Sequence, residues 1–452
     1  MRTGTQIAAS TITPSGRVGV RRWLAAGAAA LLLTSLVVVA PAIATGKDQD
    51  TADKSGNPAV ISEWNKIAED TLLGNTATSV LEDFLYMGFM HAAVYNAVVG
   101  IEGRYEPYRF RAHAPHSASS QAAAVAAAHK VLVTYSPATQ HPTLDAVYAA
   151  SLAEIPDGIA KTRGVAFGEL AADTLIAQRV DDGRNAPILF TQSPAPGVWR
   201  PTPPGFAPFT VPWMGFVTPL LVRSGAQFGE IGPPPAMTSS RYTRDFNEVK
   251  ALGSVDSIER TTEQTDTALF YSGNPLTQFN AALRDQVTVR QLDIVDAARM
   301  FAAVDMSLAD GVISIWYSKY VYGFWRPITA IQLADTDGNP ATTADPDWEA
   351  FRPTPPYPDY VSGYSGGIGA FTRALQETFD TRHLQLTFIS TAVPGATRFY
   401  DSGTQARQDV VDARVWLGFH FRFADTAGAR MGQQVARYAL DHYFQPVHHH
   451  KR

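Results

Sequence analysis

The sequence predicts an all-α protein, built as one helical bundle or a pair of packed bundles. Apolar residues recur at helical spacing over long stretches between residues 59 and 325. Alternating runs typical of strands are short and rare, and no internal repeat indicates a solenoid. The 452 residues are 45% hydrophobic, enough for a large buried core. Since no shift in composition divides residues 58–446, we expect a single domain there.

The helical periodicity predicts helices in the following order: two over 59–101, then 117–135, 142–154, 157–182, 240–252, 256–272, 276–286 and a long one over 291–325. We expect Gly100 to end the second helix and Asp157 to cap the helix 157–182. The Ala-rich run over 117–135 favours close helix packing. His129 lies within it, and we interpret this histidine as a packed, hydrogen-bonded residue.

Residues 186–240 break the pattern, because they combine many prolines with large aromatic residues such as Trp199, Phe209 and Trp213. A loop this long inside a domain is usually functional or disordered, and the aromatic content argues against disorder. Two interpretations stay open. The segment is either an ordered flap that walls an apolar pocket or a belt that covers helix ends.

Residues 1–44 are typical of an export signal. Arg21-Arg22 precede an uncharged run that closes with the small residues Ala42 and Ala44, and the arginine pair favours the twin-arginine route. A membrane anchor is the alternative, because the run is nearly long enough to span a bilayer. We therefore expect an exported or envelope-associated protein, with a disordered leader over 45–57 and a solvated tail over 447–452.

Composition excludes several classes of function. The net charge is -5 and only 17% of the residues are charged, so no basic field would attract nucleic acid. The chain has no cysteine, which excludes disulfides, thiol catalysis and thiolate metal sites. Histidine, carboxylates and hydroxyls are the chemistry that remains.

A first group of candidate site residues is formed by Lys319 and Arg326. They are seven residues apart, so on one continuous helix both would project from the same face, with Pro327 ending that helix. Spacing alone would favour a solvent-exposed ion-pair face. The surrounding tyrosines, Phe324 and Trp325 indicate burial instead, and buried cations need an anion.

A second group follows at Ser362-Gly363-Tyr364-Ser365, where we expect a helix to begin near Tyr364. Free backbone N–H groups at a helix start, together with a serine hydroxyl, can bind an oxyanion. Gly363 permits close approach of a ligand to the backbone. Taken alone this signal is weak, since Ser-Gly turns are common.

A third group joins Arg414, His420 and Asp425. Arg414 and His420 are six residues apart, which on one helix would place them about 240° around from each other. They can share a site only if a helix starts between them, for example near Gly418. His420 would then lie in its first turn, with Asp425 joining the local hydrogen bonds. The three groups together are suited to holding one phosphate-sized oxyanion.

This constellation resembles the signature of the vanadium-dependent haloperoxidases and of the type 2 acid phosphatases that share their fold. That signature has a Lys, an Arg-Pro, a Pro-Ser-Gly-His turn, and an Arg followed by a His and an Asp; the matching residues are Lys319, Arg326-Pro327, Ser362-Gly363, Arg414, His420 and Asp425. The resemblance covers roughly residues 58–446. It implies the haloperoxidase helical bundle, a vanadate or phosphate site built from these residues, and His420 as the residue that would bond vanadium.

The sequence departs from that signature at the catalytic turn, where Tyr364 replaces the histidine that acts as general acid–base. A tyrosine has an ordinary pKa near 10 and is a poor substitute at neutral pH. Tyr357 stands where relatives often have a further histidine. Both changes remove proton-transfer groups while the cations remain.

The sequence is closest in appearance to haloperoxidase homologues of actinobacterial meroterpenoid pathways. That resemblance implies a vanadium-independent α-hydroxyketone rearrangement of a prenylated naphthoquinone intermediate, with His420 as base and Lys319, Arg326 and Arg414 stabilising oxyanions. One alternative is a vanadium-dependent haloperoxidase that uses hydrogen peroxide; a second is an anion-binding protein or phosphatase. We expect no cofactor for the rearrangement and vanadate for the haloperoxidase. The expected partner is a small aromatic molecule, not nucleic acid, and a homodimer stays open.

Overall fold

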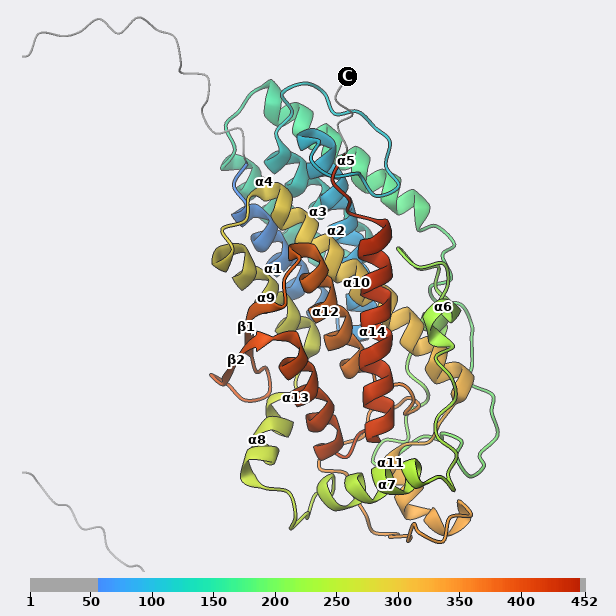
Figure 1. Cartoon of the computed structure of the whole chain (residues 1–452). Coiled ribbons are helices and arrows are strands. Elements are labelled where there is room, and N and C mark those ends of the chain that lie inside the picture. Colours follow the sequence, from blue (N-terminus) through green and yellow to red (C-terminus); the bar gives the residue numbers. More distant parts are fainter. Residues whose placement is uncertain (1–55, 448–452) are drawn as a thin grey trace, which may run out of the picture. The chain divides into compact units, whose positions relative to one another are not determined.

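The fold is organised around α10, a long helix that runs through the middle of the bundle (Figure 1). The structure is a computed structural model that describes residues 56–447. The export signal predicted over 1–44, nearly all of the leader and most of the tail lie outside the described residues.

The helices and strands are, in order, α1 (Ala59–Leu73), α2 (Val80–Glu102), α3 (Ser120–Tyr135), α4 (His141–Ala153), α5 (Ile159–Gln178), α6 (Ala226–Gly229), α7 (Ser240–Leu252), α8 (Thr262–Phe270), α9 (Pro275–Val289), α10 (Ile294–Tyr322), α11 (Pro327–Gln332), α12 (Gly363–Phe379), β1 (His383–Ile389), β2 (Thr397–Ser402), α13 (Gly403–Trp416) and α14 (Arg422–His442). Short 3₁₀ turns occur at Ala138–Gln140, Pro212–Phe216 and Ala334–Thr336. The mainly helical fold predicted from the sequence is confirmed.

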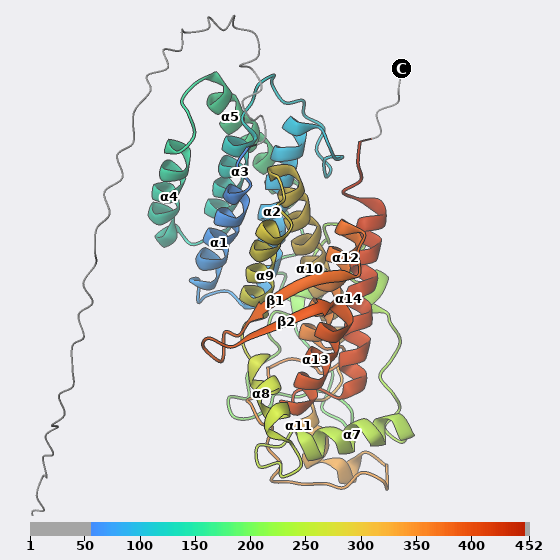
Figure 2. The same ribbon diagram turned by 60° about the vertical axis from the view of Figure 1, so that its left-hand side comes forward.

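The helices form two groups that share α10. Figure 2 shows α1–α5 on one side and α12–α14 on the other, with α9 and α10 between them. The helix α10 packs against α2 on one side and against α12 and α14 on the other. Both α2 and α10 are long and apolar enough to cross a membrane, but 89% and 94% of their apolar windows are buried within the fold. Packing on all sides accounts for their composition.

The helices α12 and α14 lie side by side and approach each other at their backbones. A methyl group on Gly369 would lie 2.2 Å from the carbonyl oxygen of Ala429, and one on Gly432 would lie 1.9 Å from the carbonyl oxygen of Gly366. Only glycine permits this contact. The close packing fixes the position of α12, whose first turn belongs to the candidate site.

Several predicted helix ends are wrong. Gly103, in the left-handed conformation with φ 70°, caps α2, so Gly100 lies inside the helix. The start of α5 has Gly158 at the N-cap position in place of Asp157. The segment predicted over 256–272 is helical only over α8, where Thr261 and Gln264 form a capping box. Tertiary contacts and caps, which periodicity does not report, set these boundaries.

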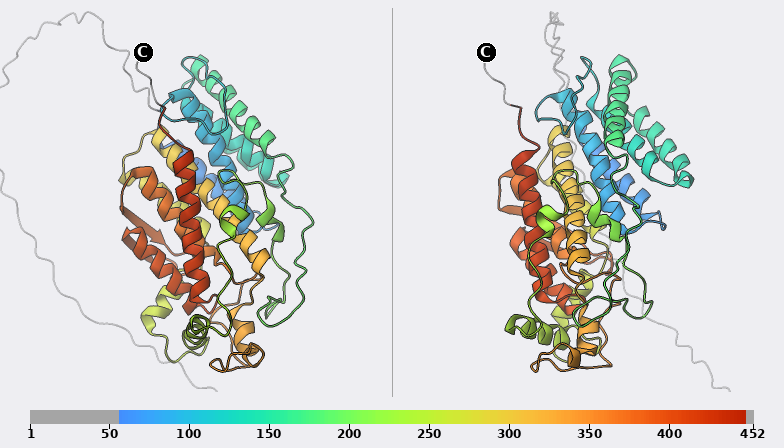
Figure 3. Two further views of the ribbon diagram at one scale, coloured as in Figure 1. Left: turned by 45° about the vertical axis from the view of Figure 1, so that its right-hand side comes forward. Right: turned by 90° about the vertical axis from the view of Figure 1, so that its right-hand side faces the viewer.

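The proline-rich segment 186–240 is ordered and wraps the outer side of α10, as the two views of Figure 3 show. Trp213 and Met214 are buried, and a methyl group on Gly215 would lie 2.5 Å from the backbone nitrogen of Tyr317. The indole nitrogen of Trp316 donates to the carbonyl oxygen of Thr210 at 3.0 Å. The segment is therefore ordered and lies along the side of α10, where its residues 220–222 donate to Asp310, whereas the belt interpretation expected it to cover helix ends.

The described residues contain one small sheet, the antiparallel hairpin of β1 and β2. Its buried residues Leu384, Leu386 and Phe388 alternate with exposed ones, so one face packs on the helices. The hairpin joins α12 to α13, and both of these helices carry candidate site residues.

Candidate active site

Lys319 and Arg326 are both buried, but they do not lie on one helix. The residue that ends α10 is Gly323, with φ 51°, and Pro327 is the first residue of α11, with Arg326 at its N-cap. The prediction that Pro327 ends the helix is therefore wrong. Glycine suits the left-handed end of a helix and proline the first turn of the next, where its missing N–H costs nothing.

The Lys319 ammonium group is bound by main-chain oxygens. Its Nζ donates to the carbonyl of Pro358 at 2.6 Å and to that of Asp359 at 3.0 Å. Complete burial, with the nearby charge of Arg326, lowers the pKa of Lys319 well below its ordinary value. This lysine holds the segment that leads into α12.

The Arg326 guanidinium also binds main-chain oxygens. Nε donates to the carbonyl of Tyr357 at 2.7 Å, Nη1 to that of Phe419 at 2.8 Å and Nη2 to that of Pro355 at 3.2 Å. It thereby ties the segment before α12 to the connection between α13 and α14. Three nitrogens of this guanidinium therefore donate to the main chain of the protein itself.

The aromatic ring of Tyr357 covers both cations. Its centroid lies 4.9 Å from Lys319 Nζ and 4.7 Å from the guanidinium carbon of Arg326. The ring also packs against Trp316, with centroids 4.9 Å apart. Cation–π attraction is strongest away from water, so the ring stabilises the two buried charges and separates them from the space beyond it.

The turn at Ser362-Gly363 begins α12, as predicted, with Ser362 at the N-cap. The hydroxyl oxygen of Ser362 is buried and lies near enough to Asp425 to lower the pKa of that carboxyl, although no hydrogen bond of ordinary geometry joins it to a described residue. Ser365 donates to Asp425 Oδ1 at 2.7 Å. Burial raises the pKa of Asp425 to about 7, against the lowering effect of hydrogen bonds from serine hydroxyls.

Tyr364 points its hydroxyl to Gln278, whose amide nitrogen donates in turn to the carbonyl of Ile389 at 2.8 Å. The phenol ring lies edge-on to Tyr271 and Phe279. Burial raises the pKa of Tyr364 further above its ordinary value, so the phenol is neutral at physiological pH. A neutral phenol bonded to an amide does not replace an acid–base histidine.

Arg414 and His420 are separated by a break in the helix, as their spacing requires. The helix α13 ends at Trp416, and Gly418 adopts φ 77°. The position predicted for His420, in the first turn of the next helix, is wrong, because α14 starts only at Arg422. His420 lies in the connection just before it. Asp425 does lie in the first turn of α14.

His420 is paired with Asp359, a residue that the sequence analysis missed. Nδ1 of His420 lies 2.7 Å from Asp359 Oδ1. Burial lowers the pKa of His420 well below its ordinary value, reinforced by the charges of Arg326, Lys319 and Arg414. Burial also raises the pKa of Asp359, against the effect of Arg326 and Lys319. The imidazole is therefore neutral, and Nη1 of Arg326 lies 3.2 Å from its Nε2, where it can donate to the ring nitrogen.

Arg414 differs from the other two cations in what surrounds it. Its Nη1 donates to the carbonyl of Tyr271 at 3.3 Å, while its Nε is buried and unpartnered within the described residues. The guanidinium carbon lies 4.6 Å from the ring centroid of Phe419 and 5.3 Å from that of Tyr364. Arg414 is thus a buried cation that retains a donor for a ligand.

A cavity of 300 Å³ adjoins this arginine. Its wall is mostly apolar and includes Phe84, Phe279, Val312, Trp316, Tyr357 and Phe419, with Gly363, Tyr364 and Arg414 at the polar end. Lys319, Arg326 and His420 do not line it, and neither does any residue of the segment 186–240. The predicted cage is therefore divided, because Arg414 and the start of α12 face the cavity while the other two cations lie behind Tyr357.

The arrangement does not fit a tetrahedral oxyanion such as vanadate held by all three cations together. The Lys319 ammonium and three donors of Arg326 are bound to carbonyl oxygens, and the Tyr357 ring covers both groups. An anion that entered between them would have to displace these contacts. Within residues 56–447, no group of three histidines or carboxylates could hold a metal ion.

His129 lies away from this cavity. Its Nε2 is 2.8 Å from Asp145 and its ring stacks on Tyr148 with centroids 4.1 Å apart. The interpretation of His129 as a packed, hydrogen-bonded residue agrees with these contacts.

The fold is that of the vanadium haloperoxidases. Residues 299–449 match the VCPO second helical-bundle domain. This match covers the segment that holds every candidate site residue named from the sequence.

Individual relatives are distant. Vanadium chloroperoxidase of Curvularia inaequalis is 24% identical over an alignment that covers 64% of this chain and 61% of that protein. The chain therefore spans about three fifths of the length of this relative. The first bacterial vanadium-dependent iodoperoxidase structure has a TM-score of 0.73 at 21% identity, covering 86% of this chain and 97% of that one. Holo-type bacterial vanadium-dependent chloroperoxidase has a TM-score of 0.64 at 17% identity, covering 86% and 98%.

Proposed function

We propose that this protein is a non-oxidative enzyme on the haloperoxidase scaffold, which isomerises an apolar α-hydroxyketone by a 1,2-shift. The observation that carries the proposal is the state of Tyr364. This residue stands at the position of the acid–base histidine, and its neutral hydroxyl is bonded to Gln278. Peroxide chemistry at this site would lack its proton relay, whereas an isomerisation needs only a base and an oxyanion site.

The reaction begins with removal of the substrate hydroxyl proton. As that hydroxyl becomes a carbonyl, a neighbouring carbon group migrates and the former carbonyl oxygen carries the negative charge. Arg414 Nε and the first N–H groups of α12 are the donors suited to that charge. The product is an isomer of the substrate, so no oxidant or cofactor enters the balance.

We assign the role of base to His420, oriented by Asp359. The histidine does not line the cavity, since Phe419 and Tyr357 lie in the wall next to it. Proton transfer from a bound substrate would therefore require the Tyr357 ring to move aside or a water to carry the proton. Substrate binding that displaces this ring is part of the proposal.

The cavity indicates the kind of substrate. Its 300 Å³ and its aromatic lining suit a planar aromatic ring system with one oxygen directed at Arg414. A prenylated naphthoquinone has these properties, although the prenyl chain would extend towards the open end of the cavity. Biosynthesis of a meroterpenoid is the pathway class that this substrate would imply.

The direct test is an incubation of purified, vanadate-free protein with a hydroxylated naphthoquinone ketone, followed by NMR of the product. The expected result is a product of unchanged mass with a migrated substituent, with turnover lost in His420→Ala and Arg414→Gln. Chelator-treated and untreated protein should be equally active. Efficient bromination of a phenol dye in the presence of vanadate and peroxide would contradict the proposal.

A vanadium-dependent haloperoxidase is the second candidate, favoured by the relatives and by the burial of Lys319, Arg326, Ser362, Arg414 and His420 in one region. Equilibrium dialysis against vanadate separates it from the first candidate. Micromolar binding that is abolished by His420→Ala would support the haloperoxidase, and absence of binding would support the isomerase. Tight binding without turnover of either kind would indicate an anion-binding protein.

A further inference from the structure

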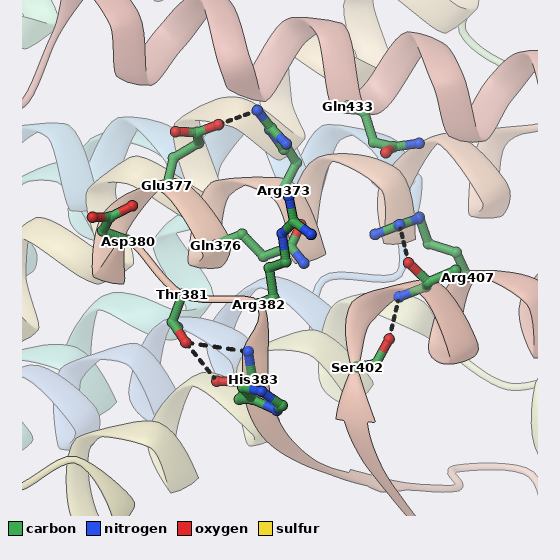
Figure 4. Close-up of a pocket in the computed structure, with 11 residues that line it drawn as sticks. Arg373, Gln376, Glu377, Asp380, Thr381, Arg382, His383, Ser402, Arg407 and Gln433 are labelled. Carbon is green, nitrogen blue, oxygen red and sulfur yellow. Dashed lines mark hydrogen bonds and ion pairs between the residues drawn. The ribbon is translucent and has the colours of Figure 1, made fainter.

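A second cavity lies at the opposite end of α12 from the candidate active site (Figure 4). Its volume is 720 Å³, and it is an open pocket bordered by the end of α12, the beginning of the hairpin, the start of α13 and the middle of α14. Gly367 and Arg373, the nearest residues of α12 in the two linings, are six residues apart, which is about 9 Å along the helix. Neither the proposed function nor the vanadium haloperoxidase fold assigns it a role here.

Three arginines converge on this cavity, and two of them have no carboxylate partner within the described residues. Arg407 donates only to hydroxyls, to Thr372 at 2.8 Å and to Thr404 at 2.9 Å. Arg382 forms no hydrogen bond or ion pair with the other lining residues, and its side chain extends towards Arg373 in Figure 4. Burial, together with the charge of Arg373, lowers the pKa of Arg407.

The remaining charges do not neutralise these arginines. Arg373 forms an ion pair with Glu377, which leaves Asp380 as the single other carboxylate in the lining. Ser402 caps the N-terminus of α13 at the rim, and the positive end of that helix dipole also points to the cavity. The lining thus holds three arginines and two carboxylates, which leaves a net positive charge that an anionic ligand would balance.

We propose that this cavity binds a small molecule that carries two or more phosphate or carboxylate groups. Arg382 and Arg407 supply the charge and the paired N–H donors that such groups accept. Gln376 and Gln433 add neutral amides to the lining. A volume of 720 Å³ accommodates a ligand larger than a single phosphate ion.

Isothermal titration of the full-length protein with pyrophosphate and, separately, with citrate tests the proposal. We expect saturable binding of at least one of them, weakened about tenfold or more by Arg382→Gln and by Arg407→Met. Arg382 is exposed, so its variant should fold normally. Arg437→Gln is the matched control, since Arg437 is an exposed arginine of α14 outside the cavity, and it should leave the affinity unchanged.

The two titrations distinguish the source of the ligand, because binding of pyrophosphate alone identifies a phosphorylated molecule and binding of citrate alone a polycarboxylate. If the heat of titration shows no saturable binding of either pyrophosphate or citrate, the proposal is overturned. Equal affinity in the wild type and in both arginine variants would overturn it as well. Arg414→Gln, at the candidate active site, should leave the titration unchanged. Loss of anion binding in this variant would place the anion at the candidate active site instead.

Discussion

At the scale of single residues, a substitution of Tyr364 tests whether this side chain stabilises the fold or takes part in catalysis. In Tyr364→Phe, the Gln278 oxygen loses its donor, so the free energy of unfolding should fall by about 1–2 kcal/mol. Isomerase turnover should remain within a few-fold of wild type, since the phenol transfers no proton. Urea denaturation and a product assay measure the two effects.

Tyr400→Phe is the matched control, because the Tyr400 hydroxyl is also buried and hydrogen-bonded, to Tyr271 and Asp409, but lies outside the cavity lining. It should show a similar loss of stability and full turnover. Loss of turnover in Tyr364→Phe alone would assign the phenol a chemical role.

Asp359 is expected to act through His420. Asp359→Asn keeps a polar partner at Nδ1 but removes the carboxylate that orients and charges the pair, so turnover should fall about 100-fold or more. The pH–rate profile should shift at the same time, which a purely structural residue would not cause. Unchanged turnover and pH profile would show that Asp359 does not act through His420.

Asp425 should give the protein a measurable pH dependence of stability. Its pKa in the folded protein is about 7, above its ordinary value of 3.8, so the unfolded chain releases this proton first. The contribution of Asp425 to the free energy of unfolding is therefore largest below pH 4. It is lost as the pH rises towards 7, by up to about 1.4 kcal/mol per pH unit.

Asp425→Asn removes this titration while keeping an oxygen for the Ser365 hydroxyl. In parallel urea denaturation series, the variant should lose less stability than wild type between pH 5 and pH 7.5, because Asp425 no longer contributes. Some loss should remain, because the buried groups Asp83 and Asp310 still titrate in the same direction. Identical slopes for the two proteins would show that Asp425 does not contribute to the pH dependence of stability in this range.

At the scale of elements, the contact between α12 and α14 leaves no room for any side chain larger than that of glycine. Gly432→Ala would place a methyl group 1.9 Å from the carbonyl oxygen of Gly366, so the helices must separate. We expect a loss of at least about 2–3 kcal/mol in the free energy of unfolding, typical of overpacking in a core. Thermal and urea denaturation measure this loss.

Gly311→Ala is the control for Gly432→Ala. Gly311 lies inside α10, where an added methyl group would be 3.8 Å from the side chain of Ala370, an ordinary contact. This variant should be neutral or more stable, because alanine favours a helix by about 1 kcal/mol over glycine. Equal destabilisation by both substitutions would contradict the proposed role of the close contact.

The sequence predicted most elements because each has a local signal. Periodicity identified most helices as far as α10, and the start of α12 followed from Ser362-Gly363, whereas the hairpin and α13 were not predicted. Asp359 was missed because its role depends on His420, which is far away in the chain and adjacent only after folding. Likewise, the carbonyl oxygens that bind Lys319 and Arg326 belong to the main chain. Every residue has such a carbonyl, so the sequence does not indicate which ones bind these cations.

At the scale of the whole molecule, export remains a prediction from residues 1–44. If the twin-arginine signal is cleaved after Ala44, N-terminal sequencing of the protein from its host should begin at Thr45. An intact N-terminus in a membrane fraction would favour the anchor. Replacement of Arg21-Arg22 by lysines should block export while leaving the folded domain active.

The way in which Lys319 and Arg326 hold carbonyl oxygens has a consequence for how related sequences are classified. The same basic residues that signal an oxyanion cage are used here as internal ties between segments 355–359 and 419. A genome search that relies on those residues would group chains with either use. The residues at positions 357 and 364, which decide whether the cations face open space and whether a proton relay exists, are the better markers for sorting such chains by chemistry.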